Sequence, residues 1–387
     1  MYAADLELVP YSKLDATARY WVKYIASHRL VIYYLQQQEQ GKDAEIEFIS
    51  ILQVARDLNA TRPEDQIYGL YGCAKRLGLD WPTPDYTKSV AQVYTDAVVA
   101  CFRKDKELGI IMGAVGPAVG ELGLPSWVPD FSGSFDTPSL FKPPELVAGS
   151  ATAKQCSGAS RCEWNFIPDG RHLKVKGRRF DYIEAVGETW RTLPPMRQTE
   201  DNTVFEVRVQ NSKRFVNCIG SWIEVVLQRN KIRDSSTNLA DDSVAISDLA
   251  DFVANANPHI PESLDRIIEN ITLVITSTRK SDVDLRKSVI DRDNDNYRTI
   301  REFTTNMSLF AWKLVFRTTN QLCMGISNYN ATAGDLLVIF HGMKSPCLIR
   351  PCAEGFNFIG EAFVEGTLNG EFWKGGSDEN DEWFTLI

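Results

Sequence analysis

The chain has 387 residues, of which 44% are apolar and 24% are charged, and these are the proportions of a folded globular protein. They exclude a disordered chain, a collagen and a low-complexity fibre. With 42 Lys and Arg against 51 Asp and Glu, the net charge is −9, and no run of four basic residues occurs. Such a surface repels phosphate groups, so neither nucleic acid nor an anionic membrane is expected as a partner. At about 150 residues per domain, the length predicts two or three domains, or one large domain.

Residues 1–112 are predicted to form a helical domain. Apolar residues recur at helical spacing from Phe48 to Ala55, and a short apolar helix is expected over residues 65–76. Two prolines in the segment WPTPD, residues 81–85, then interrupt the pattern.

The clearest helix carries a continuous apolar stripe from Val90 to Phe102. Ser89 precedes the stripe and Gln92 follows three residues later, which is the spacing of a capping box. The Ser89 hydroxyl is expected to accept from the amide of residue 92, and the Gln92 side chain is expected to return the bond. The stripe predicts a buried helix face.

Residues 113–160 are rich in Gly, Pro and Ser and are predicted to form an irregular connection. An apolar and aromatic segment, Leu124 to Phe131, interrupts it. Within this segment Trp127 and Asp130 are held by two prolines, and rigid prolines could present an indole and a carboxylate to a ligand. The alternative is that Trp127 fills the core and Asp130 caps a turn.

Residues 161–310 are predicted to contain a β-hairpin and a helical segment. From His172 the apolar residues alternate with polar ones, and Gly177 breaks the alternation. Helices are expected over residues 203–230 and 243–274. The apolar face of the first comprises Phe215, Cys218, Ile219, Trp222 and Val226.

Residues 311–387 are predicted to be β-rich and to pack on the rest of the chain, which can form one compact unit. Short apolar runs are separated by Gly, Pro and Asn, as in a small barrel or sheet. The predicted fold class is therefore α+β, with a helical N-terminal half and a mixed β-rich C-terminal part. The expected strands are residues 335–341, 345–350, 356–359 and 362–364.

Motifs for cofactors and metals are absent from the sequence. It has no phosphate loop, no strand-linked GxGxxG, no HExxH, no Cys/His ligand cluster and no GxSxG elbow. We expect no cofactor and no metal. A histidine at a strand end, as His341 is, is more often a structural residue than a base. The four histidines are widely spaced, at His28, His172, His259 and His341.

The cysteines and the N-terminal residues indicate the cellular compartment. The eight cysteines are irregularly spaced without a CxxC pair, and the first residues do not form a signal peptide. We therefore expect reduced thiols and a cytoplasmic protein. No apolar stretch approaches the roughly 20 residues that span a bilayer, so no membrane association is expected.

Six blocks of the sequence resemble fungal heterokaryon-incompatibility (HET) proteins, in the region that follows their effector domain. The blocks occur in the same order as in the family, and the resemblance extends over residues 45–372. The strand region from Leu173 to Gly187 also fits. The blocks are Arg62–Ala74, Pro84–Tyr94, Leu124–Ser132, Ala333–Phe340, Leu348–Pro351 and Phe358–Glu371.

The chain departs from the HET pattern in several places. HET proteins carry a TIR-like domain with a nucleotide-cleaving site ahead of these blocks, and its signatures are missing here. The resemblance therefore implies no NAD cleavage for this chain. Smaller departures are Phe131 where the family usually has Trp, Glu365 where it often has His, and Asn369 where Asp is usual.

Two functions are compatible with these observations. The first is a cofactor-independent cyclase or isomerase, a pericyclase such as a Diels-Alderase, that folds a hydrophobic terpenoid or polyketide in fungal secondary metabolism, where HET-like proteins also occur. Holding a flexible substrate in a reactive shape requires no conspicuous motif. Trp127 and Tyr68 are then the predicted substrate-binding walls, and Asp130 and Arg350 the predicted catalytic polar contacts.

The alternative function is non-self recognition by a truncated heterokaryon-incompatibility protein. It would act through a protein partner and without NADase activity, and a homo-oligomer is also compatible with the sequence. The structural alternative for Arg350 is a buried ion pair with Glu361 that joins two strands. A large exposed apolar patch would favour recognition, whereas a deep pocket would favour the enzyme.

Overall fold

The computed structural model describes residues 48, 52, 60–114, 122–132, 156–167, 170–189, 201–233, 242–256, 266, 268–269, 271–272, 312–367, 370–373 and 380–387. The chain divides into two compact units. The first comprises residues 1–136, 164–174 and 385–387, and the second comprises residues 137–163 and 175–384. The predicted α+β class is confirmed. The boundaries expected at residues 112, 160 and 310 remain predictions.

From residue 60 onward, the first unit contains two short helices, α3 (Asp65–Tyr68) and α4 (Tyr71–Arg76). The sequence predicts one helix here, but the chain tightens between them, where the Leu70 amide donates to the Ile67 carbonyl three residues back. Gly69 occupies this point, and a Cβ on it would lie 2.8 Å from the Asp65 carbonyl oxygen. The tightening therefore requires a glycine.

Helix α5 (Val90–Asp105) confirms the predicted capping box. The Ser89 hydroxyl accepts from the Gln92 amide at 3.3 Å, and the Gln92 side chain accepts from the Ser89 amide at 2.9 Å. The described part of this unit also contains a 3-10 helix (Gly109–Gly113) and the short strand β1 (Trp164–Phe166). The predicted stripe is buried at Val93, Tyr94, Ala97, Val98, Cys101 and Phe102.

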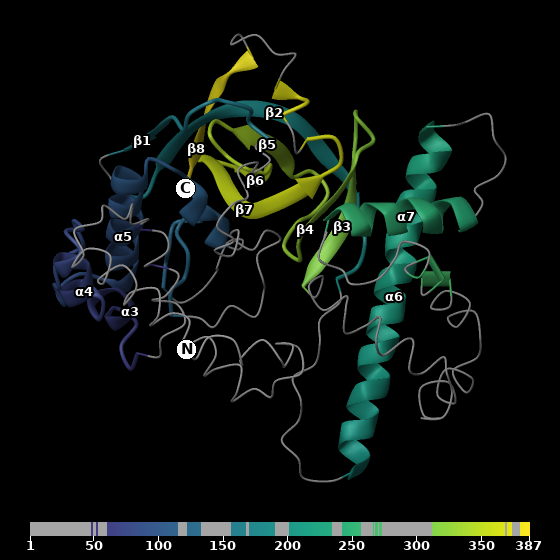
Figure 1. Cartoon of the computed structure of the whole chain (residues 1–387), viewed down its shortest axis with the longest axis horizontal. Coiled ribbons are helices and arrows are strands. Elements are labelled where there is room, and N and C mark those ends of the chain that lie inside the picture. Colours follow the sequence, from purple (N-terminus) through teal and green to yellow (C-terminus); the bar gives the residue numbers. More distant parts are fainter. Residues whose placement is uncertain are drawn as a thin grey trace, which may run out of the picture. The chain divides into compact units, whose positions relative to one another are not determined.

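The second unit is built on a closed ring of five strands, in the order β2-β8-β7-β6-β5 and back to β2 (Figure 1). Strand β8 pairs with both β2 and β7, and β2 also pairs with β5. Each of the five strands therefore has a paired neighbour on both sides. The bounds are β2 Leu173–Val186, β5 Leu336–Phe340, β6 Cys347–Cys352, β7 Gly355–Val364 and β8 Glu382–Leu386.

Strand β2 is a single strand of 14 residues, and Gly177, where the alternating pattern breaks, lies within it. Gly177 pairs with Phe340 of β5. A Cβ on Gly177 would lie 2.6 Å from the Ile339 carbonyl oxygen, which is closer than side chains permit. The glycine therefore marks a close approach of two strands, not a turn.

Two further strands, β3 (Lys313–Thr318) and β4 (Met324–Asn328), connect the C-terminal parts of β2 and β7. The predicted β-rich C-terminal part is confirmed, although the two runs expected over residues 356–364 form one strand, β7. Gly360 lies at their junction with φ of 147°, and a Cβ there would overlap the Asn328 side chain.

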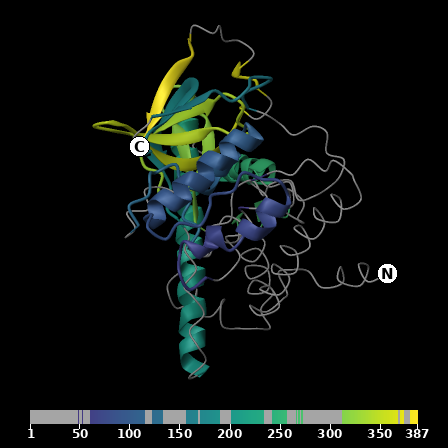
Figure 2. The ribbon, with the colours of Figure 1, turned by 90° about the vertical axis from the view of Figure 1, so that its left-hand side faces the viewer.

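Two helices pack on the β3, β4 and β7 side of the barrel, α6 (Asp201–Arg233) and α7 (Asp242–Ala256). The C-terminal part of α6 lies along the strands, while its N-terminal part extends beyond them (Figure 2). No helix in the described part of the chain is long and apolar enough to cross a membrane. The predicted face of α6 is buried at Phe215, Cys218, Ile219, Trp222 and Val226.

Candidate functional site

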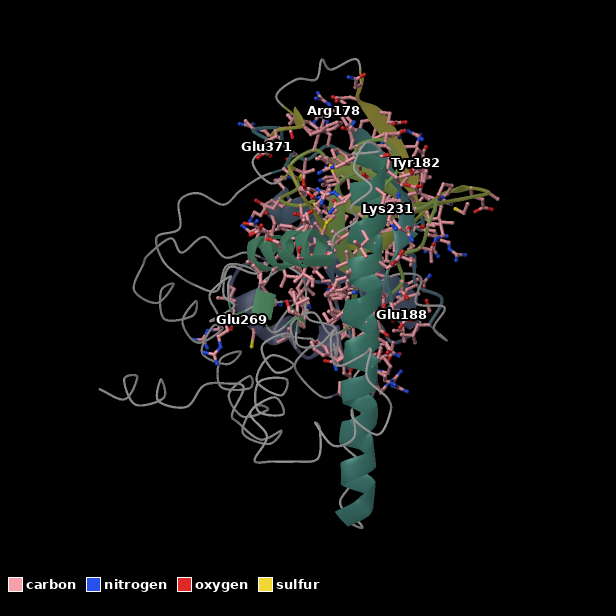
Figure 3. The ribbon with its side chains drawn as sticks, turned by 90° about the vertical axis from the view of Figure 1, so that its right-hand side faces the viewer. Arg178, Tyr182, Glu188, Lys231, Glu269 and Glu371 are labelled. Atoms are coloured by element: carbon pink, nitrogen blue, oxygen red, sulfur yellow. The ribbon has the colours of Figure 1, made fainter. Side chains whose placement is uncertain are left out.

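A group of five polar side chains, which we call the charge cluster, gathers at the barrel. Lys176 and Arg178 come from β2, and because they stand two residues apart they lie on the same side of that strand. His341 directly follows β5, Asp381 directly precedes β8, and Glu163 directly precedes β1. Arg178 lies at the end of the barrel away from the free end of α6 (Figure 3).

Asp381 is at the centre of the charge cluster. Its Oδ1 accepts a hydrogen bond of 2.6 Å from Arg178 Nε, and both side chains are only 4% exposed. Its Oδ2 lies 3.0 Å from His341 Nε2 and 3.6 Å from Lys176 Nζ. Glu163 completes the group, with Oε1 3.1 Å from Lys176 Nζ and 3.8 Å from His341 Nδ1.

Trp373 covers the charge cluster. Its ring stacks under the Arg178 guanidinium, 4.1 Å from ring centroid to Cζ, and meets the His341 ring edge-to-face at 4.8 Å. Gly158 leaves room for the indole, because a Cβ there would lie 3.2 Å from Trp373 Cδ1. An aromatic cover of this kind excludes water and strengthens the electrostatic interactions beneath it.

The electrostatics of the charge cluster depend on the protonation of His341. Burial lowers the pKa of His341, and this effect outweighs the attraction of Asp381 and Glu163, which raises it. Burial raises the pKa of Asp381, but Arg178, His341 and Lys176 together bring it below its ordinary value. With His341 neutral, Lys176 and Arg178 balance Asp381 and Glu163, two positive charges against two negative.

The arrangement is suited to joining strands. The charge cluster ties β2, the end of β5 and the start of β8 together, which are three neighbouring strands of the closed ring. The His341–Asp381 pair has the composition of a general base, but the His341 side chain is only 9% exposed. Among the described residues, no group of three or more His, Cys, Asp or Glu side chains is placed to hold a metal ion.

Trp127 and Tyr68, the predicted substrate walls, are both buried in the first unit. The Trp127 indole donates to the Arg171 carbonyl at 3.0 Å, and its ring packs against Phe102 and Phe166. The Tyr68 hydroxyl donates to the Asp85 carbonyl at 2.9 Å. Both side chains are buried, and the polar group of each makes a hydrogen bond within the interior.

Asp130, a predicted catalytic contact, closes a turn in the first unit. Its Oδ1 accepts from the Ser132 amide at 2.8 Å and from the Ser132 hydroxyl at 2.6 Å, as in an Asx turn. Among the described residues of this unit, no hydrogen bond, ion pair or ring contact joins any two of Asp130, Trp127 and Tyr68. Their roles in a substrate site remain predictions.

Arg350, the other predicted catalytic contact, belongs to the second unit. It pairs with Asp335, with Nε to Oδ1 at 2.7 Å and Nη2 to Oδ2 at 3.0 Å, and also donates to the Asn330 carbonyl at 2.8 Å. The ion pair expected with Glu361 is wrong. Leu336 pairs with Ile349 in the β5–β6 register, and this register places Asp335 opposite Arg350.

The charge cluster is not among the sites predicted from the sequence. A signal was present, since Lys176 and Arg178 alternate along a predicted strand and the C-terminal segment DENDE is strongly acidic. His341 was interpreted only as a structural residue at a strand end. Nothing in the sequence indicated that these distant segments meet.

The C-terminal part of the chain matches one protein-family model. Residues 278–386 match the family model of the Het-6 beta-barrel domain. This range contains β3 to β8, so the resemblance to HET proteins is confirmed for this region. For the blocks that precede it the resemblance remains a prediction. No curated protein and no solved structure matches the chain.

Proposed function

We propose that the protein acts in heterokaryon incompatibility, as a recognition protein whose barrel binds a protein partner. The observation that carries the proposal is the match to the Het-6 beta-barrel domain over residues 278–386, because the strands of this range form most of the closed ring. The proposed site of action is the cytoplasm, where the eight cysteines, all free, would stay reduced.

The outer surface of the barrel supports binding to a protein. Trp383 of β8 is 49% exposed and Tyr182 of β2 is 40% exposed. Arg179 of β2 donates from Nη2 to Glu382 at 3.0 Å and from Nη1 to the Tyr182 hydroxyl at 3.4 Å. Trp, Tyr and Arg dominate the energetics of protein interfaces, and a side chain fixed in advance loses less entropy on binding.

The cyclase hypothesis has no comparable support. Among the described residues, Trp127 and Tyr68 are buried in the interior. Asp130 closes a turn, and Arg350 forms an ion pair with Asp335. The proposal also includes no NAD cleavage. Incubation of the purified chain with NAD tests this point, and release of nicotinamide would contradict it.

The proposal is tested by expressing the chain in a fungal strain and fusing that strain with a panel of genetically distinct strains. We expect fusion cells to die with some partner strains and to survive with others, as scored by exclusion of a vital dye. Survival with every strain, or death with every strain, would refute a role in recognition.

Three variants locate the recognition surface. Trp383→Ser and Tyr182→Ser should abolish death, because they remove the exposed aromatic surface of the barrel. Tyr86→Ser is the matched control, since Tyr86 is an equally exposed aromatic residue, 52%, in the first unit. Equal loss in all three variants would show that the barrel surface has no special role.

A further inference from the structure

Charged side chains hold the start of β8, the last strand of the barrel, in place. Strand β8 closes the ring between β2 and β7, and Asp381 is the residue directly before it. The Asp381 side chain bonds to Arg178 of β2 and faces His341, which follows β5. The position of the start of β8 therefore depends on interactions within the charge cluster.

The charge balance of the cluster depends on one titratable group. His341 faces Asp381 and Glu163 as anions and Lys176 as a cation, and Arg178 shares Asp381 with it. These four charges cancel when His341 is neutral. A proton on His341 would add a third positive charge in a place where the carboxylate oxygens already pair with Arg178 and Lys176.

We propose that the charge cluster is a pH-sensitive latch, in which protonation of His341 loosens the closure of the ring by β8. The added charge would lie on a side chain that is only 9% exposed and covered by Trp373, so water cannot solvate it without displacing the indole. Relief of the charge requires His341 to turn toward water, which displaces Trp373 and breaks the 3.0 Å contact between His341 and Asp381, the residue that leads directly into β8.

The sign of the pH dependence follows from the same geometry. The pKa of His341 is lowered in the folded protein, chiefly by burial, so the folded state binds this proton less readily than the unfolded state. The stabilisation is complete above the ordinary histidine pKa of about 6.5 and is lost as the pH falls through that value toward the folded-state pKa. Asp381, whose pKa is lowered, stays ionised in this range.

Hydrogen exchange of the full chain, followed by mass spectrometry at pH 7.5, 6.5 and 5.5, tests the latch. After correction for intrinsic rates, the opening constants of peptides from β5 and β8 should rise by up to about tenfold per pH unit below 6.5, the limit for one linked proton. His341→Gln keeps a hydrogen-bonding side chain without the titration, and its opening constants should not change. His172→Gln is the matched control and should behave as the wild type.

A rise of equal steepness in His341→Gln, or constant opening in the wild type, would overturn the proposal. The imidazole proton resonance of His341 in the wild-type chain provides a second measurement that does not depend on the variant folding. We expect its titration midpoint below 6.5. A midpoint at or above 6.5 would mean that protonation strengthens the cluster, and the latch would be wrong.

Discussion

Gly325 of β4 is the position at which adding one methyl group should destabilise the barrel most clearly. It pairs with Phe316 of β3, and both residues are buried. A Cβ on Gly325 would lie 2.7 Å from Cε1 of the Phe316 ring and nearer still to Cζ and Cε2. The ring covers the glycine, which is how antiparallel sheets protect a glycine next to an aromatic residue.

The size of the effect follows from the overlap. Gly325→Ala should lower the free energy of unfolding by about 3 kcal/mol, the upper part of the range for overpacked cores, because the added Cβ would overlap the fully buried Phe316 ring. Phe316→Leu removes the distal ring atoms that the new methyl group meets. In that background, Gly325→Ala should cost less than about 1 kcal/mol.

The assay is a double-mutant cycle measured by urea unfolding, with circular dichroism as the signal. A coupling free energy of about 2 kcal/mol between the two sites is expected, within the range for residues in direct contact. Gly220→Ala in α6 is the control, because nothing lies within 4 Å of its added Cβ, and it should not destabilise. Additive effects of Gly325→Ala and Phe316→Leu would refute the reasoning.

Three other predictions concern single residues. Ser89→Ala removes the α5 cap and should cost about 1 kcal/mol of stability in urea unfolding. Trp127→Phe removes the hydrogen bond from the indole to the Arg171 carbonyl and should cost about 1 kcal/mol in the same assay, whereas a wall of a substrate site would change ligand binding instead. Asp381 has a lowered pKa, so its stabilisation is present above pH 3.8 and lost as the pH falls below it. Asp381→Asn should abolish this acid-dependent loss, and an unchanged pH profile would contradict the assignment.

The parts of the fold that sequence patterns predict are those determined by local periodicity. The α5 capping box and the buried face of α6 depend on residues within a few turns of one helix, and both are confirmed. The strands β5 and β6 are short apolar runs between turn residues, and they are also where the sequence places them. Each of these features needs no knowledge of distant segments.

The closure of the ring depends on contacts that periodicity does not encode. Gly177 and Phe340 pair across more than 160 positions of the chain, and a glycine in an alternating pattern equally indicates a turn or a close approach. The charge cluster also depends on contacts between distant segments, since Glu163, His341 and Asp381 come from separate parts of the chain. The Asp335–Arg350 pair, by contrast, could have been predicted by aligning the β5–β6 hairpin in register.

Strand β2 has a special position in relation to the matched family region. It lies outside residues 278–386, yet it pairs with β3, β5 and β8, which all lie inside that range. Without β2, the edges of these three strands would be left unpaired, and exposed edges favour aggregation. Arg178 on β2 also donates a hydrogen bond to the carboxylate of Asp381, the residue directly before β8. Strand β2, which ends more than 90 residues before the family match, therefore supplies both the closing strand of the barrel and the counter-charge of its last strand. The matched region is not a complete folding unit by itself.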